Sequence, residues 1–195
     1  MNTIEHLFCS SSVWRYFSEQ HLLPWVLAGS GLGQHTLEIG AGYGAATRYL
    51  RSRAERVTAL EYDRGSLLKF MKQYRADGIG VVCGDGAQLP FAPDTFTSVV
   101  AILVLHHLKS AELQDRALGE VMRVLRPGGV FAGFEITDSW VNRLVHIGST
   151  FTPLSPAAAF GRLTVAGFAK ISVDLHRGAF RFRAAKARTE ADCPG

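Results

Sequence analysis

Three glycines stand within five residues of each other, at Gly40, Gly42 and Gly44, directly after Glu38 and Ile39. A glycine-rich turn between a strand and a helix lets the backbone bend sharply and approach a ligand without obstruction by side chains. Read as a bare pattern, the turn also satisfies the dinucleotide fingerprint of NAD-dependent enzymes. The glycines alone therefore indicate a nucleotide-like ligand without deciding which one.

Three acidic residues, met along the chain in the order Glu38, Glu61 and Asp85, narrow the choice of ligand. Glu38 precedes the turn, where a carboxylate would oppose a pyrophosphate but favour a ligand with an ammonium or sulfonium group. Glu61 ends the next predicted strand, where an acid can accept hydrogen bonds from both ribose hydroxyls of either ligand class. Asp85 follows the third predicted strand and supplies an acceptor for an adenine amino group. The set favours a cationic adenosyl ligand over a dinucleotide.

Histidines are the candidate bases, because neutral imidazole is available near pH 7. His106 is the candidate catalytic residue, with the alternative of a helix-entry residue bonded to the backbone, and His107 and His146 rank below it. Tyr43, inside the glycine turn, either faces the carboxylate of the ligand or closes the start of the helix. We assign Tyr16 and His146 to a substrate lid, and no metal site is expected.

The elements that must position these residues alternate between strand and helix patterns. An α/β fold follows: a three-layer sandwich around a seven-stranded, mostly parallel sheet that ends in an antiparallel hairpin. The predicted strands are residues 36–39, 56–61, 80–83, 97–104, 130–136, 171–175 and 179–185. The predicted helices follow Asp63, cover the stripe from Leu113 to Leu125, and span residues 156–166.

Two segments fall outside this alternation. Residues 3–28 are unusually aromatic and predict one or two helices broken near Pro24, and residues 137–160 are rich in Ser, Thr, Pro and aromatics. We interpret residues 1–195 as one domain with a helical lid at 1–30, a core at 31–188 that carries a lid insertion at 137–160, and a flexible tail at 189–195.

Composition limits the class of protein. The 195 residues carry a net charge of +4 and 47% hydrophobic residues, which suits one folded core. No apolar run is long enough to cross a bilayer, and the N-terminus lacks the pattern of a secretion signal. Cys9, Cys83 and Cys193 are too far apart for a disulfide framework or a cysteine metal site, so we expect a soluble protein of the reduced cytoplasm.

A basic run near the C-terminus has two readings. Its members are Arg177, Arg181, Arg183, Lys186 and Arg188, and they alternate with Phe180 and Phe182. This alternation is typical of an edge strand protected against aggregation. An RNA-binding stripe is the less favoured reading, because one strand offers few phosphate contacts.

Taken together, the motifs resemble those of the class I, Rossmann-like S-adenosylmethionine-dependent methyltransferases, in particular the small-molecule branch labelled type 11. The resemblance spans nearly the whole chain, from about Gly33 to Arg188. The blocks that carry it are residues 37–44, 57–63, 84–91 with 94–96, 104–108 and 120–129.

The resemblance implies a role for each strand end. Glu38 and the glycines, with Tyr43, would lie near the methionine part of S-adenosylmethionine and Glu61 would lie on the ribose, while the adenine would lie among Tyr62, Asp85, Gly86 and Ala87. Ile102 and Leu103 would lie under the donor and the acceptor. Residues 101–104 stand where an Asn-Pro-Pro-Tyr-like block would be, and by comparison with the family this disfavours transfer to the amino group of a DNA base or of a glutamine amide.

The sequence thus predicts a methyltransferase that acts on a small organic acceptor at O, C or N, without nucleic-acid or membrane partners. Two alternatives remain open. The first is an NAD-dependent reductase, which rests on the glycine spacing alone. The second is a catalytically silent module that binds an adenosyl ligand, because displacement at a sulfonium needs alignment more than any one side chain.

Overall fold

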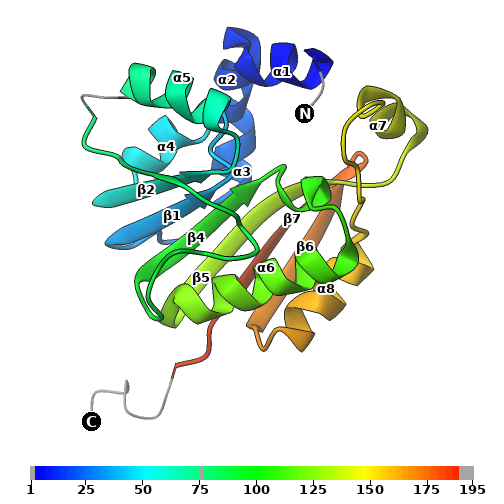
Figure 1. The fold of residues 1–195 in the computed structure, drawn as a ribbon. Helices are drawn as coiled ribbons and strands as arrows, with labels where there is room; N and C mark the ends of the chain where they lie inside the picture. The colour runs from blue at the N-terminus through cyan, green and yellow to red at the C-terminus, as the bar shows by residue number, and fades with distance from the viewer. Residues whose placement is uncertain (1–2, 75–76, 189–195) are drawn as a thin grey trace.

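A seven-stranded sheet in the order β3-β2-β1-β4-β5-β7-β6 forms the centre of the computed structural model, which describes residues 3–74 and 77–188 (Figure 1). The strands are β1 (His35–Ile39), β2 (Arg56–Glu61), β3 (Gly80–Cys83), β4 (Phe96–Ile102), β5 (Leu125–Ile136), β6 (Ala169–His176) and β7 (Ala179–Ala185). The first five pair in parallel, and β7 runs antiparallel to both of its neighbours. This confirms the predicted sheet. The predicted tail at 189–195, with Cys193, lies outside the described residues.

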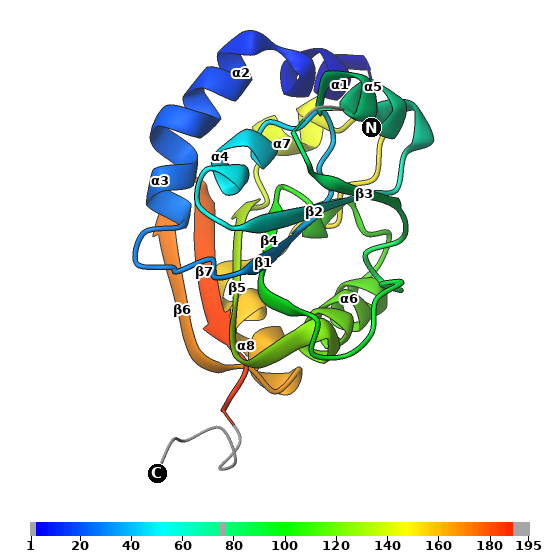
Figure 2. The same cartoon turned by 90° about the vertical axis from the view of Figure 1, so that its left-hand side faces the viewer.

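Helices cover both faces of the sheet and complete the predicted three layers (Figure 2). On one face lie α3 (Leu23–Val26), α4 (Thr47–Arg51) and α5 (Arg64–Tyr74), with α3 and α4 packed over a core that includes Val57, Val100 and Ala132. On the other lie α6 (Ala111–Val124) and α8 (Pro156–Val165), packed over Val99 and Phe131. Alternate residues of one strand thus point toward opposite helical layers, which explains why residues on both faces of β4 are apolar.

The N-terminal helices differ from the prediction at Pro24. Two elements, α1 (Thr3–Ser10) and α2 (Ser12–Phe17), are separated at Ser11, whose hydroxyl caps α2 by accepting from the Trp14 amide at 3.1 Å. From α2 the chain stays helical through a π-helical turn (Ser18–Leu22) into α3. Pro24 lies in the first turn of α3, where its missing amide and fixed φ are tolerated. The break therefore falls at the cap and not at the proline.

The basic C-terminal strand is not an edge strand, which corrects the favoured reading of that run. β7 lies between β5 and β6, and β6 forms the edge. Two cations of the run form ion pairs: Arg181 Nε lies 2.9 Å from Asp174 Oδ2 on β6, and Lys186 Nζ, just after β7, lies 2.7 Å from Asp94 Oδ1. Because these charges are matched across neighbouring elements, the run offers less free positive charge than its sequence indicates.

The strand order reverses between β1 and β4, and this is where ligands bind in open α/β sheets. Both α1 and α7 (Trp140–Val145) lie beyond the same end of the sheet in Figure 1. No helix in the described part of the chain is long and apolar enough to cross a membrane.

Candidate functional site

The glycine turn after β1 needs glycine at all three positions. The φ angles of Gly40, Gly42 and Gly44 are 70°, 53° and 79°, in the left-handed region that favours glycine. A Cβ on Gly40 would lie 2.5 Å from the Val104 side chain, and one on Gly44 would lie 2.2 Å from the Tyr74 ring. The amides of Gly40 and Ala41 also donate to Leu60 O on β2, at 2.8 and 3.1 Å. The turn is therefore held close to the neighbouring strand, and glycine at positions 40 and 44 leaves room for the side chains of Val104 and Tyr74.

Glu38 lies beneath this turn as a buried acid. Its side chain is one of the least accessible polar groups, at 3% exposure, and Thr47 Oγ1 at the start of α4 donates a hydrogen bond to its Oε2 at 2.6 Å. Burial raises the pKa of Glu38 to about 8, and the nearby charge of Glu61 acts in the same direction. The site thus holds a carboxyl group that a ligand with a positive charge would help to ionise.

Glu61 reaches the same turn from the end of β2. Its Oε2 accepts from the Gly42 amide at 2.7 Å and its Oε1 accepts from the Asp63 amide at 2.8 Å. Each carboxylate oxygen can accept a further hydrogen bond, so the pair of ribose hydroxyls assigned to Glu61 remains chemically possible. The backbone contacts orient the carboxylate and tie the ends of β1 and β2 together.

The predicted adenine residues follow β3. Asp85 Oδ1 accepts from the Ala87 amide at 2.8 Å, which shapes the turn that includes Gly86. Ala87 is buried, whereas the Tyr62 side chain is 74% exposed. A Cβ on Gly86 would lie 3.2 Å from the Ile39 side chain, so this loop passes close to the end of β1. The structure brings Asp85, Gly86 and Ala87 to the same edge as the glycine turn.

Helix α1 lies over the glycine turn. Tyr43 bonds through its hydroxyl to His6 Nδ1 at 2.6 Å, and the ammonium of Lys69 lies 5.4 Å from the centre of its ring. A cavity of about 60 Å³ separates α1 and α2 from the turn, with Cys9, Arg15 and Tyr43 among its lining residues. Pockets for small molecules typically measure about 300–1,000 Å³, and neither Glu38, Glu61 nor Asp85 lines this smaller cavity. Tyr16 is 66% exposed on α2 and is not among the lining residues of this cavity.

The predicted catalytic histidine is buried against an acid. His106 Nδ1 lies 2.5 Å from Glu135 Oε2, and the two residues are 1% and 0% exposed. Glu135 Oε1 also accepts from the amides of Val104 and Leu105, at 2.9 and 2.7 Å. The acid at the end of β5 therefore fixes the 3₁₀ turn (Leu105–His107) and the orientation of the imidazole together.

The end of β4 leads into this turn through a distorted backbone. Ile102 is half-buried, and Leu103 has a φ of 59°, a conformation that costs a residue with a Cβ about 1–2 kcal/mol. The Leu103 amide donates to Phe134 O at 2.8 Å, which holds the strained residue to β5. Strain of this kind concentrates at functional sites, and here it lies where the donor and acceptor residues were predicted.

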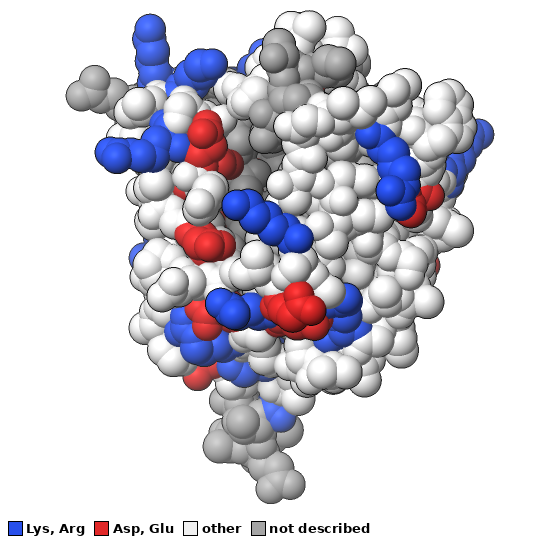
Figure 3. Space-filling model, turned by 45° about the vertical axis from the view of Figure 1, so that its right-hand side comes forward, with Lys and Arg blue, Asp and Glu red and all other residues white. Residues whose placement is uncertain are grey.

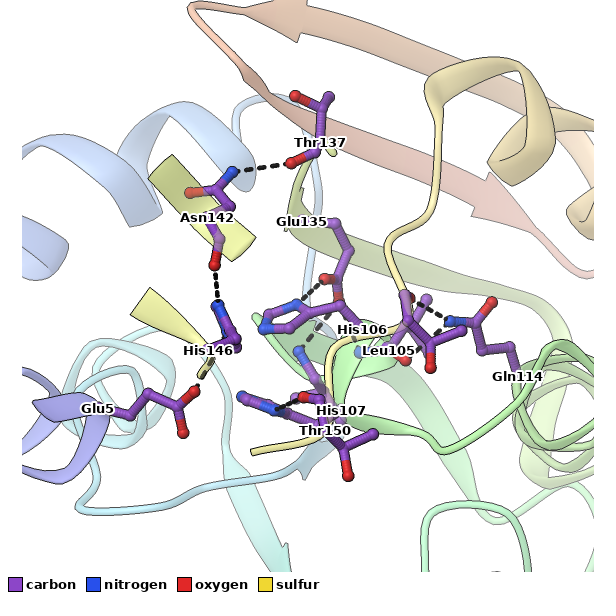
Figure 4. A network of polar contacts seen from close by, with 12 residues as sticks. Glu5, Leu105, His106, His107, Gln114, Glu135, Thr137, Asn142, His146 and Thr150 are labelled. Carbon is purple, nitrogen blue, oxygen red and sulfur yellow. Dashed lines mark hydrogen bonds and ion pairs between the residues drawn. The ribbon is translucent and has the colours of Figure 1, made fainter. Parts of the chain in front are cut away.

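Two further histidines surround His106 (Figure 4). His107 Nδ1 lies 3.3 Å from Thr150 O, and burial, together with the neighbouring His106, lowers the pKa of His107 to about 4. His146, which follows α7, lies 2.6 Å through Nδ1 from Asn142 O and 3.5 Å through Nε2 from Glu5 Oε1 on α1. Segments from three parts of the chain thus meet at one group of imidazoles.

Sequence reasoning missed Thr47, Glu135 and Glu5. Glu135 carries a usable signal, because it is a lone acid near the end of an otherwise apolar strand. Thr47 and Glu5 carry none, because the contacts of Thr47 depend on the start of α4, and those of Glu5 depend on how α1 lies against α7. Of the predicted residues, Tyr16 and Tyr62 have exposed side chains, His146 follows α7, and the others lie at or just after strand ends.

The fold and this edge define a Rossmann-like domain with an adenosyl-type site. A family model described as "Methyltransferase domain" matches residues 37–133, and the chain belongs to the S-adenosylmethionine-dependent methyltransferases of the type 11 family. S-adenosylmethionine is the methyl donor of such enzymes, so this membership favours the adenosyl ligand over the NAD alternative.

Individual relatives agree with the family. Malonyl-[acyl-carrier protein] O-methyltransferase of Methylococcus capsulatus is 32% identical over 158 residues, which are 73% of this chain and 55% of the relative. Phthiotriol/phenolphthiotriol dimycocerosates methyltransferase of Mycobacterium tuberculosis is 33% identical over 104 residues, 51% of this chain and 36% of the relative. The chain therefore spans about half or less of the length of these relatives.

A solved structure shows the same fold. The N-methyltransferase NodS of Bradyrhizobium japonicum, in complex with S-adenosyl-L-homocysteine, superimposes with a TM-score of 0.69 at 20% identity, covering 89% of this chain and 87% of that one. At this identity the likeness concerns the fold alone.

Proposed function

We propose that this protein transfers the methyl group of S-adenosylmethionine to a small organic acceptor at O, C or N. One observation supports the proposal most directly. Buried Glu38, the glycine turn and Glu61 lie together at the point where the strand order reverses. A cationic donor beside the turn favours the ionised form of this buried carboxyl group, whereas a pyrophosphate would favour its neutral form and gain no attraction from it.

Each group at the edge has one task in this proposal. Glu38 and the backbone of residues 40–44 hold the methionine part, Glu61 accepts from the ribose, and Asp85 accepts from the adenine amino group. The donor supplies an electrophilic methyl group, and the protein has to align the acceptor with it and exclude water.

The acceptor side contains the candidate base. With Nδ1 held by Glu135, His106 has its Nε2 lone pair available to take the proton that a hydroxyl, amine or acidic carbon loses on methylation. Glu135 is then a positioning residue, since it fixes the imidazole ring and supports the charge that forms on it. Helices in residues 1–30 and the segment 137–160 serve as the acceptor-side lid, with His146 facing the site.

Surface charge supports a small acceptor over nucleic acid. On the face shown in Figure 3, Lys and Arg side chains are separated by acidic side chains and uncharged surface, and they form no continuous basic stripe. The named relatives include methyltransferases of an acyl-carrier-protein malonyl group and of dimycocerosates, which supports an acceptor other than RNA. Free Cys83, exposed on β3, is compatible with the reduced cytoplasm as the place of reaction.

Thermal unfolding with added ligands tests the donor site. S-adenosylmethionine and S-adenosylhomocysteine are expected to raise the melting temperature, and NADH is not. Glu61→Ala should weaken the binding of S-adenosylhomocysteine by about 1–3 kcal/mol, because a charged hydrogen-bond acceptor is lost, while Glu55→Ala at an exposed loop position should not. Stabilisation by NADH alone, or unchanged affinity in Glu61→Ala, would contradict the donor assignment.

Methyl transfer itself needs a separate measurement. Incubation with methyl-labelled donor and a panel of hydroxy, amino and activated-carbon acceptors should label at least one compound, and labelling should depend on His106. Donor binding without labelling of any acceptor would favour the catalytically silent module.

A further inference from the structure

Three imidazoles converge beside the proposed acceptor site. His106 and His107 come from the turn after β4, and His146 comes from the segment after α7, about forty residues further along the chain. One ring nitrogen of each lies within 4.8 Å of the others. His106 and His146 are buried and His107 is half-buried, so the group is largely removed from bulk solvent.

All three rings are oriented in the same way. Each Nδ1 lies against an oxygen: His106 against Glu135 Oε2 at 2.5 Å, His107 against Thr150 O at 3.3 Å, and His146 against Asn142 O at 2.6 Å. Such a contact places the proton on Nδ1 and leaves the Nε2 lone pair for another partner. Histidines that bind metal ions almost always have their second nitrogen engaged with a carboxylate or carbonyl in this manner.

We propose that His106, His107 and His146 bind a divalent transition-metal ion such as Zn²⁺ through their Nε2 atoms. Zn–N bonds measure about 2.0–2.1 Å, so two nitrogens on one ion are at most about 4.2 Å apart. One ring nitrogen of each histidine now lies within 4.8 Å of the others, so the side chains have to rotate to bring three Nε2 atoms onto one ion. This proposal departs from the sequence expectation of no metal site, because nothing in the chain order predicts that His146 returns to the His106–His107 pair.

Electrostatics favours a cation at this position. Glu135 is fully buried behind His106, and Glu5 Oε1 lies 3.5 Å from His146 Nε2, so two carboxyl groups flank three imidazoles.

A metal site with three protein ligands leaves one coordination position for substrate. This role of the ion extends the proposed function and rests on it, whereas the binding of the ion does not. An oxygen or nitrogen of the acceptor bound at the open position would lose its proton more easily, as water does on catalytic zinc. The Nε2 lone pair of His106 cannot hold an ion and accept a proton at the same time. His106 is therefore a ligand in the loaded protein and a base in the metal-free one.

Cobalt titration tests the site without any activity measurement. The full chain without a polyhistidine tag, first dialysed against a chelator, is titrated with Co²⁺, whose visible absorption reports its ligands and geometry. We expect one ion per chain and displacement by one equivalent of Zn²⁺. His107→Ala and His146→Ala, on different segments, should each bind Co²⁺ at least tenfold more weakly, whereas His21→Ala, an exposed histidine outside the group, should bind as the wild type does.

Melting temperatures of the metal-free variants establish that each one is folded, and Co²⁺ should raise the melting temperature of the wild type and of His21→Ala only. Absence of a saturable one-to-one Co²⁺ spectrum in the wild type, or unchanged affinity in both His107→Ala and His146→Ala, would overturn the metal site. Binding of S-adenosylhomocysteine, measured on the same samples, reports on the proposed function separately. If Co²⁺ does not bind but S-adenosylhomocysteine still does, the metal site is rejected and the proposed function is unaffected.

Discussion

At the scale of single residues, Glu38 illustrates what position and burial each contribute. Its place before the glycine turn is visible in the sequence, and that was enough to assign it to a cationic ligand. Its protonation is not visible there, because the pKa near 8 arises from burial and from the second acid, Glu61. Whether a strand-end acid is solvated or enclosed depends on Thr47 and the start of α4, which only the folded chain defines.

The raised pKa makes the stability of the ligand-free protein depend on pH. Between about 4.5 and 8 the native protein keeps the Glu38 proton that the unfolded chain releases, so the free energy of unfolding falls as pH rises through this window. The loss is on the order of several kcal/mol. In Glu38→Gln this contribution is absent, so the variant should become more stable relative to the wild type from pH 5 to pH 8.

Urea denaturation at pH 5, 7 and 8.5 measures this difference. Glu55→Gln removes an exposed carboxylate and should follow the wild type at every pH. Parallel pH profiles for the wild type and Glu38→Gln would show that Glu38 is ionised in the folded protein throughout the range.

At the scale of elements, the sequence was informative wherever a local pattern determines the structure. Strand and helix periods placed β2 and β3 at their observed bounds, and Ser110 and the run after Leu125 marked the ends of α6. The hairpin of β6 and β7 was equally clear, but a hairpin specifies only the pairing of its own two strands. Which of them lies against β5 is decided by tertiary packing, and Phe180 and Phe182 are buried there because β7 is the inner strand.

Two glycines of the same turn provide a matched test of that element. Gly44→Ala introduces a Cβ about 2.2 Å from the Tyr74 ring at a φ of 79°, so the helix-facing part of the turn must shift. Gly42→Ala has an unfavourable φ of 53° but meets nothing closer than 4.0 Å. We expect losses in the free energy of unfolding of about 1–2 kcal/mol for Gly42→Ala, from backbone strain alone, and roughly twice that or more for Gly44→Ala.

Denaturant titration of the two variants at one pH provides the comparison. In a Tyr74→Ala background, Gly44→Ala should cost less free energy of unfolding than it does in the wild type, because the clashing ring is gone. Equal destabilisation by Gly42→Ala and Gly44→Ala would mean that contact with Tyr74 does not limit the position of the turn.

At the scale of the whole molecule, the two segments predicted as lids meet across the ligand edge. Glu5 on α1 accepts a short hydrogen bond from Ser149 Oγ and lies 3.5 Å from His146 Nε2. Segments about 140 residues apart in the chain are thus joined by direct contacts. This contact could not be anticipated from sequence, because neither segment contains a pattern that specifies its partner.

The contact should control how readily the site opens. Helix α1 contacts the glycine turn through the His6–Tyr43 hydrogen bond and the segment after α7 through Glu5, so we expect its separation from either one to widen access to the turn. In Glu5→Gln the charged acceptor for Ser149 is lost, at a cost of about 1–3 kcal/mol to the closed state. We expect amide hydrogens in residues 3–10 and 140–149 to exchange at least fivefold faster, because local opening becomes more favourable.

Donor binding should change in the same variant in a characteristic way. Faster opening raises the association rate of S-adenosylhomocysteine in stopped-flow measurements, whereas protection of β4 and β5 against exchange, which reports global unfolding, should remain nearly unchanged. Glu55→Gln, at an exposed position far from either segment in sequence, is the matched control and should leave both quantities as in the wild type. If Glu5→Gln instead lowered protection uniformly across the sheet, Glu5 would stabilise the whole fold, and the two segments would not act as a lid.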